Sequence, residues 1–492
     1  MQTTIHEKTL LHFEIPPEDW AKTPESVRRA LLRVWQENQA MADKSRTSSR
    51  NSSLPPSKDP PQHKRPRRKH ATGRKPGGQP GHRGVTRPLV PPDQLTTPPI
   101  IVTPAVCPCG HLFPADAPTT GHPWRHQVFE LPPITPIITE YQLAYCSCPE
   151  CGATIRADRP AGVPALTVGP RAQAFITVLT GQYHLAKRAV AQILQDVCGL
   201  PLSPASVCAV EQAMSAVLDA PVAALRATVQ QAPVKHLDES GWPQRRDRDP
   251  GQLNTLPLKR GWLWSMTTPD ATVYLIRRSR AQAIARELLG VSEHATEYDA
   301  VVVTDRHGAY NWLPLANRQI CWAHLDRDFL AISERSDPHA QRIGTGLMTQ
   351  VDLLFDAWQL YQDGSVTFAD MGAALQPVRK EITALLHEGH TADPKTKTVC
   401  ANLLKLDPAL WTFLSIEGVE PTNNRAERSQ RRGVCKRDRT FGTQTSAGSR
   451  YVERILTTVA TCRQQGQNTL VYLTEALLAA LHDTPYPSLI TP

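Results

Sequence analysis

The chain reads Ala-Val-Val-Val-Thr-Asp-Arg-His-Gly at residues 300–308, a short β-branched run that ends in Asp305. A short apolar run bounded by polar residues is typical of a buried strand. A second such run, from Val234 to Leu237, ends in Asp238 in the same way. We therefore expect both aspartates at strand ends, although on its own Asp238 is no better a candidate ligand than its neighbour Glu239.

Strand and helix patterns alternate through residues 230–330. Strands are predicted at 234–237, 261–267 and 272–276, then a helix at 281–289, then strands at 300–304 and 319–322. Three strands, a helix and a fourth strand are the order of an α/β ribonuclease H-like fold. We predict that residues 230–330 form the first part of such a core.

Glu427 lies in the polar stretch Thr-Asn-Asn-Arg-Ala-Glu-Arg at residues 422–428, which reads as the start of a helix. The interval from Asp305 to Glu427 is too long for a minimal core. We predict a helical insertion at 331–418, the last part of the core at 419–465, and a C-terminal helix and tail at 466–492. Two aspartates at strand ends and a glutamate on a helix can converge on a pair of divalent metal ions acting at a phosphodiester.

Composition points to a multidomain protein with a polyanionic partner. The 492 residues carry a net charge of +9, and 26 of the 44 prolines lie among the first 164 residues, which we therefore expect to be rich in loops. We find no signal peptide and no apolar run long enough to span a membrane, so a cytosolic protein is expected. Disulfides are then unexpected, and clustered cysteines are better candidates for metal ligands.

The N-terminal part carries a basic arm. Residues 1–40 predict a helix, either a coiled-coil or docking helix or a peripheral amphipathic one, and residues 41–98 predict a disordered basic linker. This linker could neutralise DNA phosphates or be a solvated tail. The arm residues that we expect to contact DNA are Lys64, Arg65, Arg67, Arg68, Lys69, Arg74 and Lys75.

A small zinc-binding module is predicted at residues 99–160. Cys148-Pro-Glu-Cys151 has the spacing of one half of a zinc site, and Cys107-Pro-Cys109 is one residue shorter. Four thiolates would close a tetrahedral structural site, with Cys146 as a spare ligand. The alternative is a set of free thiols.

Residues 165–225 predict a helical segment that resembles a helix-turn-helix. A Gly-Leu-Pro-Leu turn at 199–202 is followed by Ser203 as N-cap and Pro204 in the first helical turn. This arrangement is typical of a DNA-reading motif, but a plain helical hairpin would show the same signals.

Several motifs in this order resemble the DDE transposases of the insertion sequence 66 family, over nearly the whole chain. The motifs are Gly-Gly-Gln-Pro-Gly-His-Arg-Gly at 77–84, His-Leu-Asp-Glu-Ser-Gly-Trp at 236–242, Thr-Asp-Arg-His-Gly-Ala-Tyr at 304–310, Cys-Trp-Ala-His-Leu-Asp-Arg-Asp-Phe at 321–329, Asn-Asn-Arg-Ala-Glu-Arg at 423–428 and Phe-Gly-Thr-Gln-Thr-Ser-Ala-Gly-Ser-Arg at 441–450. The short Cys107-Pro-Cys109 pair leaves the geometry of the zinc site open.

The resemblance implies a catalytic triad of Asp238, Asp305 and Glu427 that binds two Mg²⁺ or Mn²⁺ ions. Water would cut the transposon end, and the 3′-hydroxyl formed would attack a target phosphodiester without a covalent protein intermediate. The flanking residues have further expected roles. Arg425 and Arg428 would hold phosphates or pair with nearby carboxylates, Cys321 and His324 would support the site, and Asp326 and Asp328 are rival carboxylates.

The expected partner is double-stranded DNA, both the element's ends and the target, in the cytoplasm of a bacterium. Related elements suggest a homo-oligomer on paired ends and helper proteins from the same element. Two other functions stay open: an end-binding or regulatory protein with an inactive core, and a ribonuclease or resolvase on the same fold. The basic arm and the helix-turn-helix candidate favour a protein that binds specific DNA ends over a ribonuclease.

Overall fold

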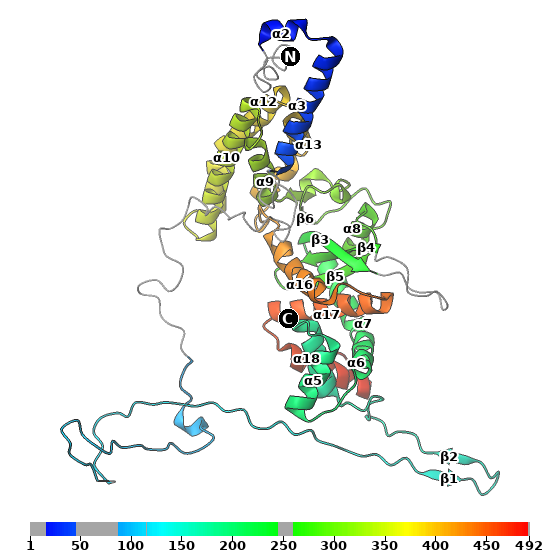
Figure 1. The fold of residues 1–492 in the computed structure, drawn as a ribbon. Coiled ribbons are helices and arrows are strands. Elements are labelled where there is room, and N and C mark those ends of the chain that lie inside the picture. Colours follow the sequence, from blue (N-terminus) through cyan, green and yellow to red (C-terminus); the bar gives the residue numbers. More distant parts are fainter. Residues whose placement is uncertain (1–15, 46–86, 115, 245–258, 491–492) are drawn as a thin grey trace. The chain divides into compact units, whose positions relative to one another are not determined.

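The computed structural model describes residues 16–45, 87–114, 116–244 and 259–490 (Figure 1). They belong to two compact units, one of Met1–Asp59 with Pro136–Pro492 and one of Pro60–Thr135. In the smaller unit the described chain forms the short 3-10 helix η2 (Pro92–Gln94) and an isolated β-bridge between Val106 and Leu112.

One five-stranded sheet organises the larger unit. Its order is β5-β4-β3-β6-β7, with β3, β4 and β5 antiparallel and with β6 and β7 parallel to β3. The strands are β3 (Val234–Gln244), β4 (Lys259–Thr267), β5 (Thr272–Arg277), β6 (Val301–Thr304) and β7 (Arg318–Ile320), and helix α8 (Gln282–Leu289) lies between β5 and β6 in the chain. This is the order of elements predicted for a ribonuclease H-like sheet. Every residue of β6 is buried, as in strands covered on both faces.

The register of β3 corrects one expectation about the aspartates. β3 pairs with β6 only from Val234 to His236, but it pairs with β4 as far as Gln244. The strand predicted to end before Asp238 therefore continues, because its antiparallel partner extends it on the other side. Asp238 lies inside β3, just past the end of the parallel ladder, whereas Asp305 directly follows β6 as expected.

Helix α17 (Ser446–Gln464) covers the edge of the sheet. Strand β5 is an edge strand, and its outward N–H groups at Thr272, Tyr274 and Ile276 donate to side chains of α17. The acceptors, spaced one helical turn apart, are Thr461 Oγ1 (3.2 Å), Thr457 Oγ1 (3.0 Å) and Glu453 Oε1 (2.6 Å). The helix thereby satisfies an edge that would otherwise be open to pairing with another strand.

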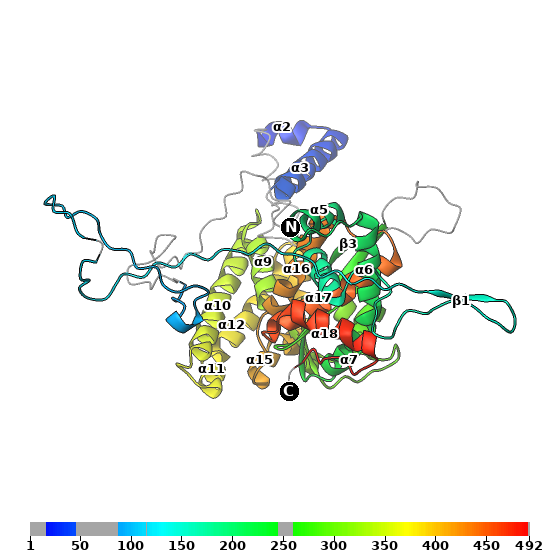
Figure 2. The ribbon, with the colours of Figure 1, turned by 90° about the horizontal axis from the view of Figure 1, so that it is seen from below.

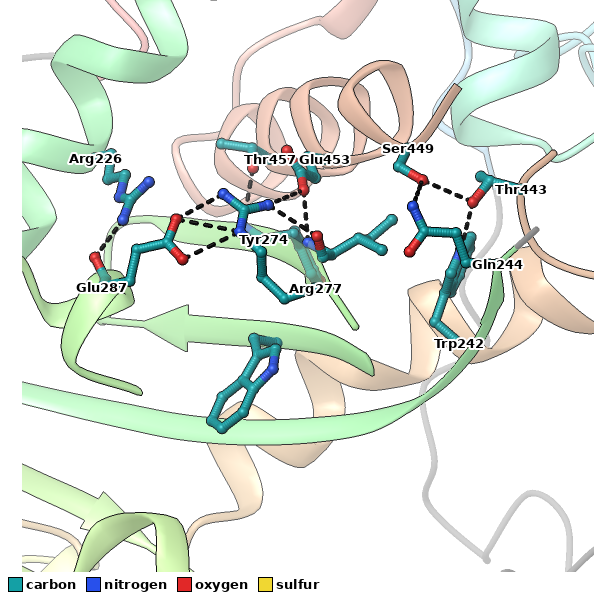
Figure 3. A network of polar contacts seen from close by, with 12 residues as sticks. Arg226, Trp242, Gln244, Tyr274, Arg277, Glu287, Thr443, Ser449, Glu453 and Thr457 are labelled. Carbon is teal, nitrogen blue, oxygen red and sulfur yellow. Dashed lines mark hydrogen bonds and ion pairs between the residues drawn. The ribbon is translucent and has the colours of Figure 1, made fainter. Parts of the chain in front are cut away.

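A network of polar contacts extends this seam in both directions (Figure 3). At one end Arg277 joins Glu453 and Glu287. At the other end the Trp242 indole N–H donates to Thr443 Oγ1 at 3.1 Å, beside Ser449. The ends of β3 and β5 and the helix α17 are therefore held together by hydrogen bonds as well as by apolar packing.

Replacing Thr457 by valine tests this seam. Valine keeps the shape of the side chain but leaves the buried Tyr274 N–H without an acceptor. We expect the free energy of unfolding to fall by about 1–3 kcal/mol in urea titrations. The matched control is Thr349→Val on an exposed helical surface, which should cost less than about 0.5 kcal/mol. Equal effects of the two substitutions would contradict this role for Thr457.

Helices fill the interval between β7 and α16 (Asn424–Thr440), where the sequence predicts a helical insertion. They are α9 (Trp322–Ser333), α10 (Pro338–Gln362), α11 (Phe368–Ala374), α12 (Gln376–Glu388), α13 (Pro394–Lys405), α14 (Asp407–Leu410) and α15 (Thr412–Ser415). Their apolar residues form a core of their own, which also receives Val301, Val303 and Ile320 from the sheet. Figure 2 shows α10, α11 and α12 side by side. The insertion is thus joined to the sheet by burial of apolar surface.

Further helices precede and follow the sheet. They are α2 (Pro17–Lys22), α3 (Glu25–Ser45), α4 (Pro170–Thr177), the π-helical turn η3 (Val178–Gln182), α5 (Lys187–Cys198), α6 (Pro204–Val217), α7 (Asp219–Gln230) and α18 (Thr469–His482). No single described helix is long and apolar enough to cross a membrane, while α6 and α7, bent by 47° at their junction, would pass that test as a pair.

The predicted helical pair at 165–225 is present, and its DNA-reading role stays a prediction. Ser203 caps α6 by accepting from the Ser206 N–H at 3.0 Å, and Gly199 ends α5 with a φ of 60°. Helix α6 carries no lysine or arginine, and it packs against α17 and α18. The described surface of α6 therefore favours the plain hairpin over a DNA-reading helix.

Candidate active site

Three acidic residues lie near enough to interact electrostatically where β3, β6 and α16 meet, although their ligand oxygens do not all lie within 4.8 Å of one another. Asp238 comes from β3, Asp305 follows β6, and Glu427 lies in the first turn of α16. Burial raises the pKa of Asp238 well above its usual value, and the negative charges of Glu239, Asp305 and Glu427 raise it further. Carboxylates that repel one another in this way form a donor set that suits hard divalent cations.

Glu239, the neighbour of Asp238, belongs to a different network. Strand pleating points the two side chains to opposite faces of β3. One carboxylate oxygen of Glu239 accepts from Arg280 Nε at 2.6 Å, and the other accepts from the Tyr310 hydroxyl. Both oxygens of Glu239 are therefore engaged within the protein, and Asp238 is the better ligand candidate.

Arg318 holds the backbone at Asp305 by a hydrogen bond. This buried arginine of β7 donates from Nη2 to the Asp305 carbonyl oxygen at 3.0 Å, and burial lowers its pKa to about 10. The Asp305 carboxylate accepts from the His307 N–H at 2.8 Å. Asp305 is thereby fixed at both its main chain and its side chain.

Two buried amides fasten α16 to β3 on either side of Glu427. Asn423 Nδ2 donates to the Leu237 carbonyl oxygen at 2.6 Å, and Gln430 Nε2 donates to the Asp238 carbonyl oxygen at 2.9 Å. We did not single out either residue from the sequence. The available signals were the place of Asn423 in the Asn-Asn-Arg-Ala-Glu-Arg motif and the place of Gln430 one helical turn after Glu427.

Cys321, the N-cap of α9, and His324, in its first turn, lie beside Glu427. Cys321 Sγ is buried and accepts from the Asn423 N–H at 3.1 Å, and burial raises the pKa of the thiol to about 12. His324 Nδ1 lies 3.5 Å from Glu427 Oε1. The rival carboxylate Asp328 instead forms an ion pair with Arg306 at 2.6 Å.

The basic residues predicted to bind DNA divide into three groups. Arg425 pairs with Glu420 at 2.6 Å, which matches the alternative of a nearby carboxylate. Arg428 is exposed and has no ion-pair partner among the described residues. The basic arm from Lys64 to Lys75 lies outside the residues that the structure describes.

Helix α16 continues the basic surface beyond Arg428. Arg428, Arg431 and Arg439 are exposed, with Cys435 exposed between them. Spacings of three and four residues place these side chains on one face of the helix. We did not predict Arg431 and Arg439, although the spacing of basic residues in the sequence was a usable signal.

The cysteine pairs form two similar turns, one in each unit. In the first, Gly110 N–H donates to the Cys107 carbonyl oxygen at 2.8 Å, and in the second Gly152 N–H donates to that of Cys148 at 2.9 Å. Both glycines have a positive φ. The pKa of the Cys109 thiol is lowered mainly by the backbone N–H of His111. The pKa of the Cys148 thiol is lowered mainly by the backbone N–H of Cys151. Each turn lowers the pKa of one of its thiols, and a site made of Cys107, Cys109, Cys148 and Cys151 stays a prediction.

The raised pKa of Asp238 leads to a stability prediction. Its charged form is disfavoured in the folded protein, so stability is lost as the pH rises from the usual aspartate pKa through the raised pKa of the folded state. In a chelator at pH 7, Asp238→Asn should raise the free energy of unfolding by about 1–2 kcal/mol, and the gain should shrink towards pH 4. Asp352→Asn, at an exposed position of α10, should change it little. A lower free energy of unfolding for Asp238→Asn would show that the repulsion between Asp238 and the neighbouring carboxylates is already relieved without a cation.

Comparisons with known proteins place this site in a family. The family model described as transposase IS66 family matches residues 166–451, and a family of unknown function, DUF6444, matches residues 26–88. The uncharacterized protein y4qI of Sinorhizobium fredii is 24% identical over 246 residues. That match covers 44% of this chain and 43% of the relative, so the chain spans less than half the length of this curated relative.

Two solved structures of the Mos1 transposase show a slight likeness. The paired-end complex with the left transposon end has a TM-score of 0.10 at 14% identity and covers 31% of this chain and 56% of that one. The strand transfer complex has a TM-score of 0.11 at 12% identity, covering 32% and 56%. The family rests instead on the model that matches more than half of the residues and includes all three acids of the site, and by that match the chain belongs to the transposase IS66 family.

Proposed function

We propose that this transposase cleaves DNA at the ends of an insertion sequence and joins them to target DNA by a metal-dependent DDE mechanism. The observation that supports the proposal most is the proximity of Asp238, Asp305 and Glu427 on three neighbouring elements, where Asp305 and Glu427 add to the rise in the pKa of Asp238 that burial causes first. These three carboxylates would hold two Mg²⁺ or Mn²⁺ ions. Bound there, such ions would stabilise the attacking and leaving oxygens at a phosphodiester.

The chain's own contribution is positioning. Asn423 and Gln430 hold α16 against β3, and Arg318 holds the backbone at Asp305, which supports a site whose backbone is positioned before substrate arrives. In this proposal water attacks the phosphorus at the element's end and the 3′-oxygen leaves as a hydroxyl. That hydroxyl then attacks a target phosphodiester, displacing its 3′-oxygen, and no protein side chain is bonded to the DNA.

Asp305→Asn tests the catalytic proposal. With a labelled duplex carrying the element's end and Mg²⁺ or Mn²⁺, we expect the wild type to make a nick or a joined product. The variant should lose more than about 100-fold of this activity, because outer-shell partners of metals alone are worth 10–100-fold. Asp299→Asn, at an exposed position six residues earlier, is the matched control and should cleave normally.

The outcomes separate the competing functions. Salt-sensitive binding to the end without cleavage by any of the three proteins, even after the element's other proteins are added, would favour an end-binding protein with an inactive core. Cleavage of RNA–DNA hybrids in preference to the duplex would favour a ribonuclease.

We further propose that the exposed face of α16 follows the DNA backbone as it leaves the site. This face carries Arg428, Arg431 and Arg439 along the helix that holds Glu427. Double-stranded DNA carries dense negative charge, and arginines spaced along one face can each neutralise a phosphate. The basic arm from Lys64 to Lys75 would add contacts of the same, sequence-independent kind.

The double variant Arg428→Ala and Arg431→Ala tests this path. If each arginine neutralises one phosphate, the slope of log affinity against log salt should fall in magnitude by about 1.8. The control removes two exposed lysines of the insertion, Lys380→Ala with Lys397→Ala, for the same change in charge. An identical slope in both double variants would exclude a specific path along α16.

Two parts of the proposal concern assembly. We propose a structural Zn²⁺ held by Cys107, Cys109, Cys148 and Cys151, on the grounds of two similar turns in which the pKa of one thiol, Cys109 or Cys148, is lowered by backbone N–H groups. We also propose double-stranded DNA as the partner, a homo-oligomer on paired ends, and helper proteins from the same element.

A further inference from the structure

Cys321, His324 and Glu427 form a cluster whose chemistry differs from that of the three acids. One ligand atom from each residue lies within 4.8 Å of the other two, and this is the group of potential metal ligands found among the described residues. His324 Nδ1 and Glu427 Oε1 are 3.5 Å apart. Zinc bonds of about 2.0–2.2 Å to nitrogen and oxygen place neighbouring tetrahedral ligands roughly 3.3–3.6 Å apart, so this pair already has the required spacing.

The two facing atoms lack other partners. His324 Nδ1 and Glu427 Oε1 are both buried, and neither has a hydrogen-bond partner among the described residues. Buried polar atoms without partners are rare and costly, and each one calls for an explanation such as an ion. The other carboxylate oxygen of Glu427 faces Arg327 at 3.8 Å, so Oε1 is the oxygen that stays available.

The third ligand is fixed by the backbone of the opposite helix. Cys321 Sγ accepts from the Asn423 N–H, and Trp322 N–H donates to the Pro421 carbonyl oxygen at 2.9 Å. These two bonds hold the start of α9 against the start of α16. On α9, Cys321 and His324 are three residues apart and so lie on the same side of the first turn.

We propose that Cys321, His324 and Glu427 bind one borderline divalent ion, Zn²⁺ in particular, with a fourth position open to water. Thiolate and imidazole ligands select Zn²⁺ or Co²⁺ over Mg²⁺, which prefers oxygen. Three protein ligands with an open fourth position are the arrangement of non-structural zinc sites, in which water or substrate takes the fourth position. The site shares Glu427 with the proposed Mg²⁺ pair but does not depend on DNA cleavage, and it is separate from the cysteine turns.

Cobalt titration of the metal-free full-length protein tests the site. Co²⁺ bound to a thiolate gives a charge-transfer band in the near ultraviolet. The turns at Cys107 and Cys148 would contribute to this band as well, so the informative quantity is the difference between variants. Relative to the wild type, Cys321→Ser should lose one equivalent of bound Co²⁺ and part of the band. His324→Asn should keep the band but weaken binding at this site by at least tenfold.

Cys462→Ser is the matched control, because Cys462 is buried on α17, away from any other metal-binding group found in the described chain. It should bind as many Co²⁺ ions as the wild type. Cys148→Ser should lose the other cysteine site and keep this one. If Cys321→Ser fails to fold, His324→Asn, at a partly exposed position, decides the question alone.

Equal stoichiometry and equal spectra for the wild type, Cys321→Ser and His324→Asn would overturn the proposal. The measurement needs no DNA, so it also separates this site from the proposed function. Cleavage without this cobalt site would refute only the zinc proposal. The cobalt site without cleavage would refute only the catalytic one.

Discussion

The close packing of α16 on the sheet is the constraint on which the site depends. Gly433 lies so near strand β4 that an added Cβ would come 2.0 Å from Leu263 Cδ2. A larger residue would therefore push the helix away from the sheet. At the present separation Gln430 reaches the Asp238 and Leu263 carbonyl oxygens at 2.9 and 3.0 Å. The position of Glu427, one turn earlier, follows from this contact.

This packing has an electrostatic cost that the rest of the fold must offset. It brings Glu427 into the field of Asp238 and Asp305, and burial of the Asp238 carboxyl together with these negative charges disfavours its ionised form. Three features elsewhere in the fold offset this electrostatic cost. The sheet edge is covered by α17, the insertion has a core of its own, and Arg318 supplies a buried positive charge beneath Asp305. A site that is unfavourable without its ligands and supported by stable surroundings is typical of catalytic centres.

Local patterns predicted the sheet well and the contacts within the site poorly. β-Branched runs such as 300–304 predict their strands because burial on both faces selects those residues. The predicted end of β3 was wrong, because the length of this strand is set by pairing with β4 and not by its own apolar run. Asn423 and Gln430 were missed because their partners on β3 lie far away in the sequence. Arg425 could be placed only as one of two alternatives, because its pairing with Glu420 depends on the turn that starts α16.

Glu427 has two oxygens with different surroundings, and this difference gives the residue a dual character. Oε1 faces the imidazole of His324, beside the thiol of Cys321, whereas Oε2 faces the guanidinium of Arg327. If both proposed sites exist, an ion that prefers sulfur and nitrogen would bind at Oε1, and an ion that prefers oxygen would share Glu427 with the aspartates. Because a carboxylate oriented for one ion is not free to reorient for the other, occupancy of the two proposed sites would be coupled through the first turn of α16. The residue that completes the acidic triad is then also the one through which a second metal can influence it.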